Sequence, residues 1–187
     1  MCSILNVVMY MKVCFLDIDK KKLKNIKDDT RYVIITNSDL DNINEYNIFE
    51  FKPIIIAYNG SYVIDLENNS VIIKKPISEY CLNKVLDYTN SHDVNTKLYQ
   101  NNKDLFEIKL ETRNRNRMMV IPKLFKDKIP NVRSVGDLET IYVTNSNASV
   151  INAIGEVLSY LNINEDIIGL DNIYNNININ GTLLASY

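Results

Sequence analysis

Three short apolar runs in the first third of the chain each end in polar residues, and this pattern constrains the fold more than any other feature. The runs span residues 11–16, 32–35 and 53–57. Continuous runs rich in Ile and Val are typical of parallel strands that are covered on both faces. Binding sites of open parallel sheets lie just past the carboxyl ends of the strands. The sequence therefore predicts an α/β fold with a Rossmann-like parallel sheet and a polar site at one sheet edge.

The size and charge of the chain exclude several classes of protein. Its 187 residues, 46% of them hydrophobic, suit one domain or a small domain that carries an insertion. The 21 basic and 23 acidic residues give a net charge of −2, which argues against a nucleic-acid partner. No apolar run approaches the roughly 20 residues that span a bilayer, so no membrane segment is expected. Nothing in the pattern predicts an oligomeric state.

The cysteine and histidine counts limit the chemistry and the compartment. The three cysteines are odd in number and widely spaced, and no CxxC pair occurs. This usage predicts a reducing compartment, the cytoplasm, without a structural disulfide or a zinc site. His92 is the single histidine, which all but excludes His-based triads and multi-His metal sites.

The middle of the chain has a different pattern, with shorter and more polar elements. Residues 62–75 predict a hairpin that turns at 67–69, and residues 78–88 predict an amphipathic helix. Short strands are expected at residues 97–99, 105–108 and 118–121. We therefore expect an α+β insertion over residues 61–135, and an α/β core formed by residues 1–60 and 136–187.

The last part of the chain returns to the first pattern. A strand is expected at residues 140–143, and residues 149–161 form the clearest helix, with Ser146 or Asn147 as the candidate cap. A further strand at residues 166–171 ends in Asp171. Its carboxylate is expected at the same edge as the earlier polar strand ends.

Asp17 and Asp19 bracket one residue at the end of the first predicted strand. Side chains alternate along a strand, so both carboxylates can point the same way, and with Asp171 they would form an oxygen-rich pocket suited to Mg²⁺. An aspartate beside Mg²⁺ can attack phosphorus, and a second carboxylate can protonate the leaving oxygen. The alternative interpretation of the same pair is two solvated loop acids.

Several segments together resemble the haloacid dehalogenase superfamily, most closely the Cof-type phosphatases with an α+β cap after the third strand. Residues 11–19 look like the family's first motif, residues 33–37 its second, and residues 167–172 its fourth. Residues 56–63 are similar to its Asn-Gly-Ala stretch, and residues 71–78 to the start of its cap. Residues 147–154 fit the helix that normally begins with the third-motif Lys-Gly.

The resemblance implies a function and a set of site residues. It implies a Mg²⁺-dependent phosphatase that acts on a small phosphorylated metabolite through an aspartyl-phosphate, with Asp17 as nucleophile and Asp19 as acid/base. The Thr36 hydroxyl would hold the phosphoryl group. Metal ligands would be Asp17, Asp19 and Asp171. Substrate contacts are expected at Asn37, Asn59, Gly60, Asn147 and Lys20.

The chain also departs from the family pattern at several positions. Lys20-Lys21 replaces the Gly-Thr after the first motif, Asn37-Ser38 replaces Gly-Arg, and Asn147 aligns with the third-motif lysine. After Asp171, residues 174–176 stand where the fourth motif has Asn-Asp; they are either one residue out of step or have Asn in place of the Asp. These losses predict slow turnover, and they support an alternative: a catalytically inactive relative that binds a ligand or a protein partner.

Two sets of basic residues are candidate anion contacts. Lys20 can be expected to fold back and replace the missing lysine; the competing interpretation is a solvated loop of the run 20–24. Arg113, Arg115 and Arg117 alternate with Asn and would share one face of a strand. In a cap they would hold the distal anionic group of a substrate, and otherwise they form a solvated hairpin edge.

Overall fold

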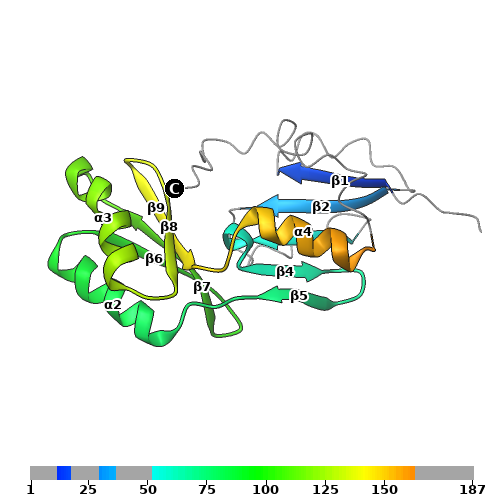
Figure 1. Ribbon diagram of the computed structural model, residues 1–187, viewed down its shortest axis with the longest axis horizontal. Helices are drawn as coiled ribbons and strands as arrows, with labels where there is room; N and C mark the ends of the chain where they lie inside the picture. Colours follow the sequence, from blue (N-terminus) through cyan, green and yellow to red (C-terminus); the bar gives the residue numbers. More distant parts are fainter. Residues whose placement is uncertain (1–11, 18–29, 37–51, 163–187) are drawn as a thin grey trace, which may run out of the picture.

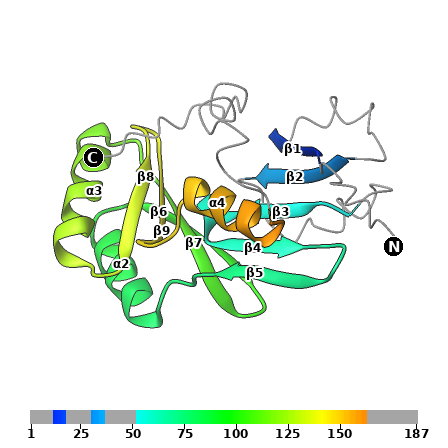
Figure 2. The same ribbon diagram turned by 45° about the vertical axis from the view of Figure 1, so that its right-hand side comes forward.

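Two β-sheets, with helices packed on one face of each, form the part of the chain that the structure describes. The computed structural model describes residues 12–17, 30–36 and 52–162, and for residues 12–17 and 30 it describes the backbone alone. Figure 1 shows the two sheets side by side, and Figure 2 shows them after a rotation of 45°. Within these ranges, no helix has the length and apolar character needed to cross a bilayer.

The first sheet confirms the predicted parallel strands. Its strands are β1 (Lys12–Asp17), β2 (Thr30–Thr36), β3 (Ile54–Ala57), β4 (Tyr62–Asp65) and β5 (Ser70–Lys74), in that spatial order. The first three are parallel, and the β4–β5 hairpin adds two antiparallel strands beside β3. The short 3₁₀ turn η2 (Tyr58–Gly60) connects β3 to the hairpin. The three carboxyl ends therefore lie at one edge, as the sequence predicts.

Helix α4 (Val150–Tyr160) covers one face of the first sheet (Figure 1). Ala153, Ile154, Val157 and Leu158 are buried against apolar side chains of β2, β3, β4 and β5. The 3.6-residue spacing predicts this face, except that it also places the exposed Ile151 there and leaves out the buried Ala153. The N-cap is Ser149, whose hydroxyl accepts the backbone N–H of Asn152 at 3.0 Å. The expectation of a cap at residue 146 or 147 is wrong, because the helix begins later.

The second sheet carries two helices on one face. Its elements are α2 (Glu79–Ser91), β6 (Asn95–Asn101), β7 (Asp104–Glu111), α3 (Arg115–Lys128), β8 (Val132–Gly136) and β9 (Thr140–Asn145). All pairs in the spatial order β6-β7-β9-β8 are antiparallel. The opposite face of this sheet looks toward the arrowheads of β1 and β2 (Figures 1 and 2).

The division between the two sheets differs from the expected bounds of 61–135. The hairpin of residues 62–74 belongs to the first sheet, because β4 pairs with β3. The strand at residues 140–145 belongs to the second sheet, where Ile141 and Val143 are buried under the two helices. The chain thus leaves the first sheet after Lys74 and returns to it with α4.

The expectation of a strand at residues 118–121 is wrong, because these residues lie in α3. Asn114 caps the helix by accepting the N–H of Arg117, and the buried side chains are Met118, Ile121 and Phe125. This spacing gives one face of a helix. Arg113, Arg115 and Arg117 consequently do not share a strand face. The predicted strand at 166–171 lies outside the described residues.

A buried carboxylate holds the hairpin to β2 and α4. Asp65 has no exposed side-chain surface, and it pairs with the guanidinium of Arg31, which also contacts Glu67. The Asp65 oxygens accept the Asn68 amide at 2.8 Å, the Glu67 N–H at 2.9 Å and the Tyr160 hydroxyl at 3.1 Å. Burial would raise the pKa of Asp65, but these hydrogen bonds and the charge of Arg31 lower it.

Replacing Asp65 should therefore destabilise the fold strongly. We expect Asp65→Asn to reduce the free energy of unfolding by about 3 kcal/mol, because it leaves the partly buried Arg31 without its buried partner. Glu67→Gln is the matched control, since it removes the exposed carboxylate from the same arginine and should cost about 0.5 kcal/mol. Urea denaturation at pH 7 measures both free energies of unfolding. Equal losses in the two variants would contradict the role of Asp65 as the main partner of Arg31.

Candidate functional site

The carboxyl edge of the parallel strands brings Asp17 and Thr36 to adjacent positions. Asp17 is the last residue of β1 and pairs with Ile35, while Thr36 is the last residue of β2 and pairs with Ala57. Standard sheet spacings put the Cα atoms of Asp17 and Thr36 about 6 Å apart. Thr36 is buried, with 3% of its surface exposed. The two residues expected to act on phosphorus thus come from neighbouring strands at one edge.

Four of the predicted site residues lie outside the described residues, namely Asp19, Lys20, Asn37 and Asp171. Within the described ranges, no group of three or more His, Cys, Asp or Glu side chains is arranged to hold a metal ion. Asp17 is the one expected Mg²⁺ ligand whose backbone position is described, at the strand edge. A carboxylate at that position provides the oxygen donor that Mg²⁺ prefers.

The η2 turn explains why a glycine stands at position 60. Its three residues all have positive φ angles, with values of 50° at Tyr58, 54° at Asn59 and 83° at Gly60. A Cβ on Gly60 would lie 2.3 Å from the carbonyl oxygen of Ser149. Only glycine therefore allows the start of α4 to sit directly against the end of β3. This close packing accounts for Gly60 without any contact to a substrate.

The η2 turn also attaches the second sheet to the first. The Tyr58 ring is buried and stacks on Phe106 with centroids 5.6 Å apart. The Asn59 amide nitrogen donates to a Glu107 carboxylate oxygen at 2.5 Å. A bulge makes both contacts possible, because Tyr99 pairs with Glu107 and Gln100 with Leu105, which leaves Phe106 as the extra residue. Adjacent residues of β7 can then face the same side.

Glu107 is a fully buried carboxyl group at the junction of the two sheets. Desolvation raises its pKa to about 7, against the smaller opposing effects of the Asn59 hydrogen bond and the Lys109 charge. Among the described residues, its second oxygen, Oε1, has no hydrogen-bond partner. The same holds for the buried hydroxyl of Thr144, with which Glu107 is paired in the sheet. The carboxyl group can therefore hold a proton near neutral pH.

Two basic side chains contact the backbone just before α4, beside the sheet edge. The Lys75 ammonium donates to the carbonyl of Asn147 at 3.0 Å, and the Arg133 guanidinium donates to the carbonyl of Ala148 at 2.8 Å. The Asn147 side chain is exposed. The segment that the resemblance aligns with the third motif thus has an amide in place of the lysine, but cations from β8 and from the linker after β5 lie against it.

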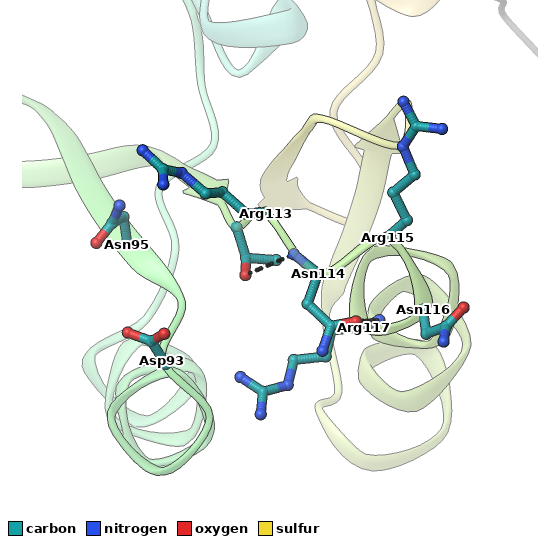
Figure 3. Close-up of a pocket in the computed structure, with 8 residues that line it drawn as sticks. Asp93, Asn95, Arg113, Asn114, Arg115, Asn116 and Arg117 are labelled. Carbon is teal, nitrogen blue, oxygen red and sulfur yellow. Dashed lines mark hydrogen bonds between the residues drawn. The ribbon is translucent and has the colours of Figure 1, made fainter.

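The three arginines singled out in the sequence line an open hollow of 860 Å³ between the end of α2 and the start of α3. Figure 3 shows their guanidinium groups leaving the chain in three different directions. Asp93 and Asn95 line the same hollow. The arginines therefore do not converge on one anion position.

Sequence reasoning missed Glu107, Lys75 and Arg133. Glu107 left a faint signal, since an acid between Phe106 and Ile108 interrupts an apolar strand. Lys75 and Arg133 cannot be recognised from the sequence, because each one binds a backbone carbonyl that only the folded chain brings near it.

Comparisons with known proteins agree with this geometry. A family model described as haloacid dehalogenase-like hydrolase matches residues 17–182, so that the match begins at Asp17. No curated protein sequence matches the chain.

Solved structures of this superfamily have a similar fold. A haloacid dehalogenase-like hydrolase from B. subtilis aligns with a TM-score of 0.67 and 13% identity, covering 82% of this chain and 80% of that chain. A superfamily phosphatase from Bacteroides thetaiotaomicron gives 0.62 and 14%, covering 87% and 77%. A subclass IIB sugar phosphatase gives 0.57 and 15%, covering 82% and 77%. At these identities the likeness establishes the fold.

The close contact of Gly60 with Ser149 can be tested by substitution. Gly60→Ala should lower the free energy of unfolding by about 2 kcal/mol or more, because it strains a positive φ and forces a Cβ into the Ser149 carbonyl. Gly155→Ala, inside α4, is the control and should be neutral or stabilising by up to about 1 kcal/mol. Urea denaturation gives both values. A Gly60→Ala protein as stable as wild type would show that α4 does not pack so closely.

The raised pKa of Glu107 should make the stability of the protein depend on pH. Between pH 4.5 and about 7 the folded chain keeps a proton on Glu107 that the unfolded chain has lost, so the free energy of unfolding falls as the pH rises through this window. The difference amounts to about 3 kcal/mol. Glu107→Gln should remove most of this fall between pH 5 and pH 8. The measurement is urea denaturation at both values.

The matched control for Glu107 lies on the same strand. The Glu111 carboxylate is half exposed and contacts the Lys109 ammonium at 2.5 Å, so Glu111→Gln should leave the pH dependence close to that of wild type. A fall in stability of the same size in Glu107→Gln and in wild type would show that Glu107 is not the titrating group.

Proposed function

The chain belongs to the haloacid dehalogenase-like hydrolase family, and from this premise we propose that it is a Mg²⁺-dependent phosphomonoesterase. The observation that carries the proposal is the adjacent placement of Asp17 and Thr36 at the carboxyl edge of the parallel sheet. The family match begins at Asp17 and includes Asp19, Thr36 and Asp171. The proposed substrate is a small phosphorylated metabolite, and a sugar phosphate is the first class to test, since one neighbour is described as a sugar phosphatase.

The proposed reaction has two displacements at phosphorus. An Asp17 carboxylate oxygen attacks phosphorus, the bond from phosphorus to the substrate oxygen breaks, and Asp19 protonates that leaving oxygen. Asp19 then takes a proton from water, whose oxygen attacks phosphorus and releases inorganic phosphate and the free Asp17 carboxylate. The Thr36 hydroxyl donates a hydrogen bond that holds the phosphoryl group between the two steps.

The metal and the substrate would be held by different parts of the site. Asp17, Asp19 and Asp171 would hold Mg²⁺, which supplies positive charge against the phosphoryl oxygens. Asn37, Asn147 and Lys20 would contact the phosphorylated end of the substrate. The second sheet would act as the cap, with Asn59 and Gly60 at the point where it joins the first sheet. The buried free thiol of Cys81 fits a reducing compartment, the cytoplasm.

One observation favours a second function. The exposed Asn147 offers an uncharged amide at the position that the resemblance aligns with the third-motif lysine. Loss of a charge at that point should lower the rate by about a hundredfold or more, judging from comparable electrostatic contributions. The second candidate is therefore a catalytically inactive member of the family that binds a phosphorylated ligand or a protein partner.

Hydrolysis of an aryl phosphate with Mg²⁺ tests the first function. We expect measurable turnover by wild type, a loss of about a hundredfold or more in Asp17→Asn, and loss of activity on chelation of the metal. Asp93→Asn is the control acid, because Asp93 lines the hollow beside α2 and should not change the rate. Equal rates in wild type and Asp17→Asn would reject Asp17 as nucleophile, and folded wild type without any activity would favour the binding function.

A further inference from the structure

Arg133 is a half-buried cation without an anionic partner among the residues that the structure describes. One of its guanidinium nitrogens donates to the carbonyl of Ala148 at 2.8 Å. In the described part of the chain, no carboxylate lies within ion-pair distance of it. Desolvation lowers the pKa of Arg133, because burial disfavours the charged form of the guanidinium.

Arg31 provides the comparison within the same molecule. Its side chain is 14% exposed, and both Asp65 and Glu67 contact its guanidinium. The fold thus compensates this partly buried arginine with two carboxylates. Buried charges are normally paired, so an arginine that is half buried without a counter-charge indicates a place for an anionic ligand.

Arg133 lies on the sheet face that looks toward the candidate site. It is paired with Thr144 in β9, and Thr144 is paired with Glu107 in β7, so the three side chains share one face. The helices α2 and α3 pack on the opposite face, through Val132, Val143 and their neighbours. The face of Arg133 is therefore the one directed at the first sheet (Figures 1 and 2).

A chain of close contacts links Arg133 to the carboxyl edge of the parallel strands. Arg133 binds the carbonyl of Ala148, and the next residue, Ser149, packs directly against Gly60. Gly60 ends the turn that begins right after Ala57, which is the partner of Thr36 in the sheet. The guanidinium is thus held beside the segment in which Asn147 lacks a positive charge.

We propose that Arg133 binds the phosphoryl group of the ligand, supplying from β8 the positive charge that Asn147 does not provide. The inference rests on the proposed function for the identity of the anion. A guanidinium has several N–H donors in one plane, so one nitrogen can stay on Ala148 while others bind phosphoryl oxygens. Lys20, the cation suggested by the sequence, is the competing source of the charge.

The first experiment measures binding of inorganic phosphate to the full chain by calorimetry, with Mg²⁺ present. We expect Arg133→Gln to weaken the affinity at least tenfold and Arg133→Lys to restore part of it, since a lysine keeps the charge but not the fork. Lys126→Gln is the matched control, because the exposed Lys126 lies in α3, on the opposite face of the second sheet, and its loss should change the affinity less than threefold. Circular dichroism on the same samples verifies that each variant is folded.

The second measurement is aryl phosphate hydrolysis by the same variants, with an expected fall in kcat/KM of about a hundredfold for Arg133→Gln. If wild type binds phosphate and hydrolyses nothing, the phosphatase proposal fails, while loss of binding in Arg133→Gln still supports the role of Arg133. Wild type that binds no phosphate overturns that role. Unchanged affinity in folded Arg133→Gln overturns it too. The same binding measurement on Lys20→Ala tests the competing source, and a loss of affinity confined to that variant assigns the charge to Lys20.

Discussion

The close approach of Gly60 to the Ser149 carbonyl is the contact on which the arrangement of this molecule depends. It seats the beginning of α4 against the end of β3, and α4 then covers the apolar face of the first sheet. The same left-handed turn directs Tyr58 and Asn59 toward the second sheet. There the Tyr58 ring stacks on Phe106, and the Asn59 amide donates a hydrogen bond to Glu107. A single turn therefore fixes the helix, the sheet edge and the neighbouring sheet relative to one another.

Two buried carboxyl groups and one half-buried guanidinium are accommodated in three different ways. Asp65 is stabilised as an anion by Arg31 and by hydrogen bonds, and it contributes to holding the hairpin. Glu107 reduces its desolvation cost by binding a proton, because burial outweighs the effects of Asn59 and Lys109, which favour its charged form. Arg133 has no carboxylate partner among the described residues, and it cannot become neutral, since arginine does not lose its proton in proteins. Its charge is therefore the one that a bound anion would complement.

The sequence predicts what depends on local patterns and fails where distant residues decide. The parallel strands and the hairpin follow from continuous apolar runs and a polar turn, which local residues determine. The segment 118–121 is expected to be a strand, and Pro122 directly after it disfavours a helix. It forms a helix because Phe125, further along the chain, extends its buried apolar face. Glu107 and Arg133 become neighbours of the site through strand register and a bulge, which no short pattern encodes.

If the positive charge at the phosphoryl group comes from Arg133, phosphate binding depends on how the second sheet is placed against the first. A lysine at the start of α4 would be held by the helix that packs on the first sheet, and its position would not depend on the second sheet. Arg133 belongs to β8, so the phosphoryl group would bind fully only while the second sheet is docked. Docking involves the hydrogen bond between Asn59 and Glu107, which lies two strands away from Arg133 on the same face. Phosphate binding and docking of the two sheets would then be thermodynamically coupled, with each strengthening the other.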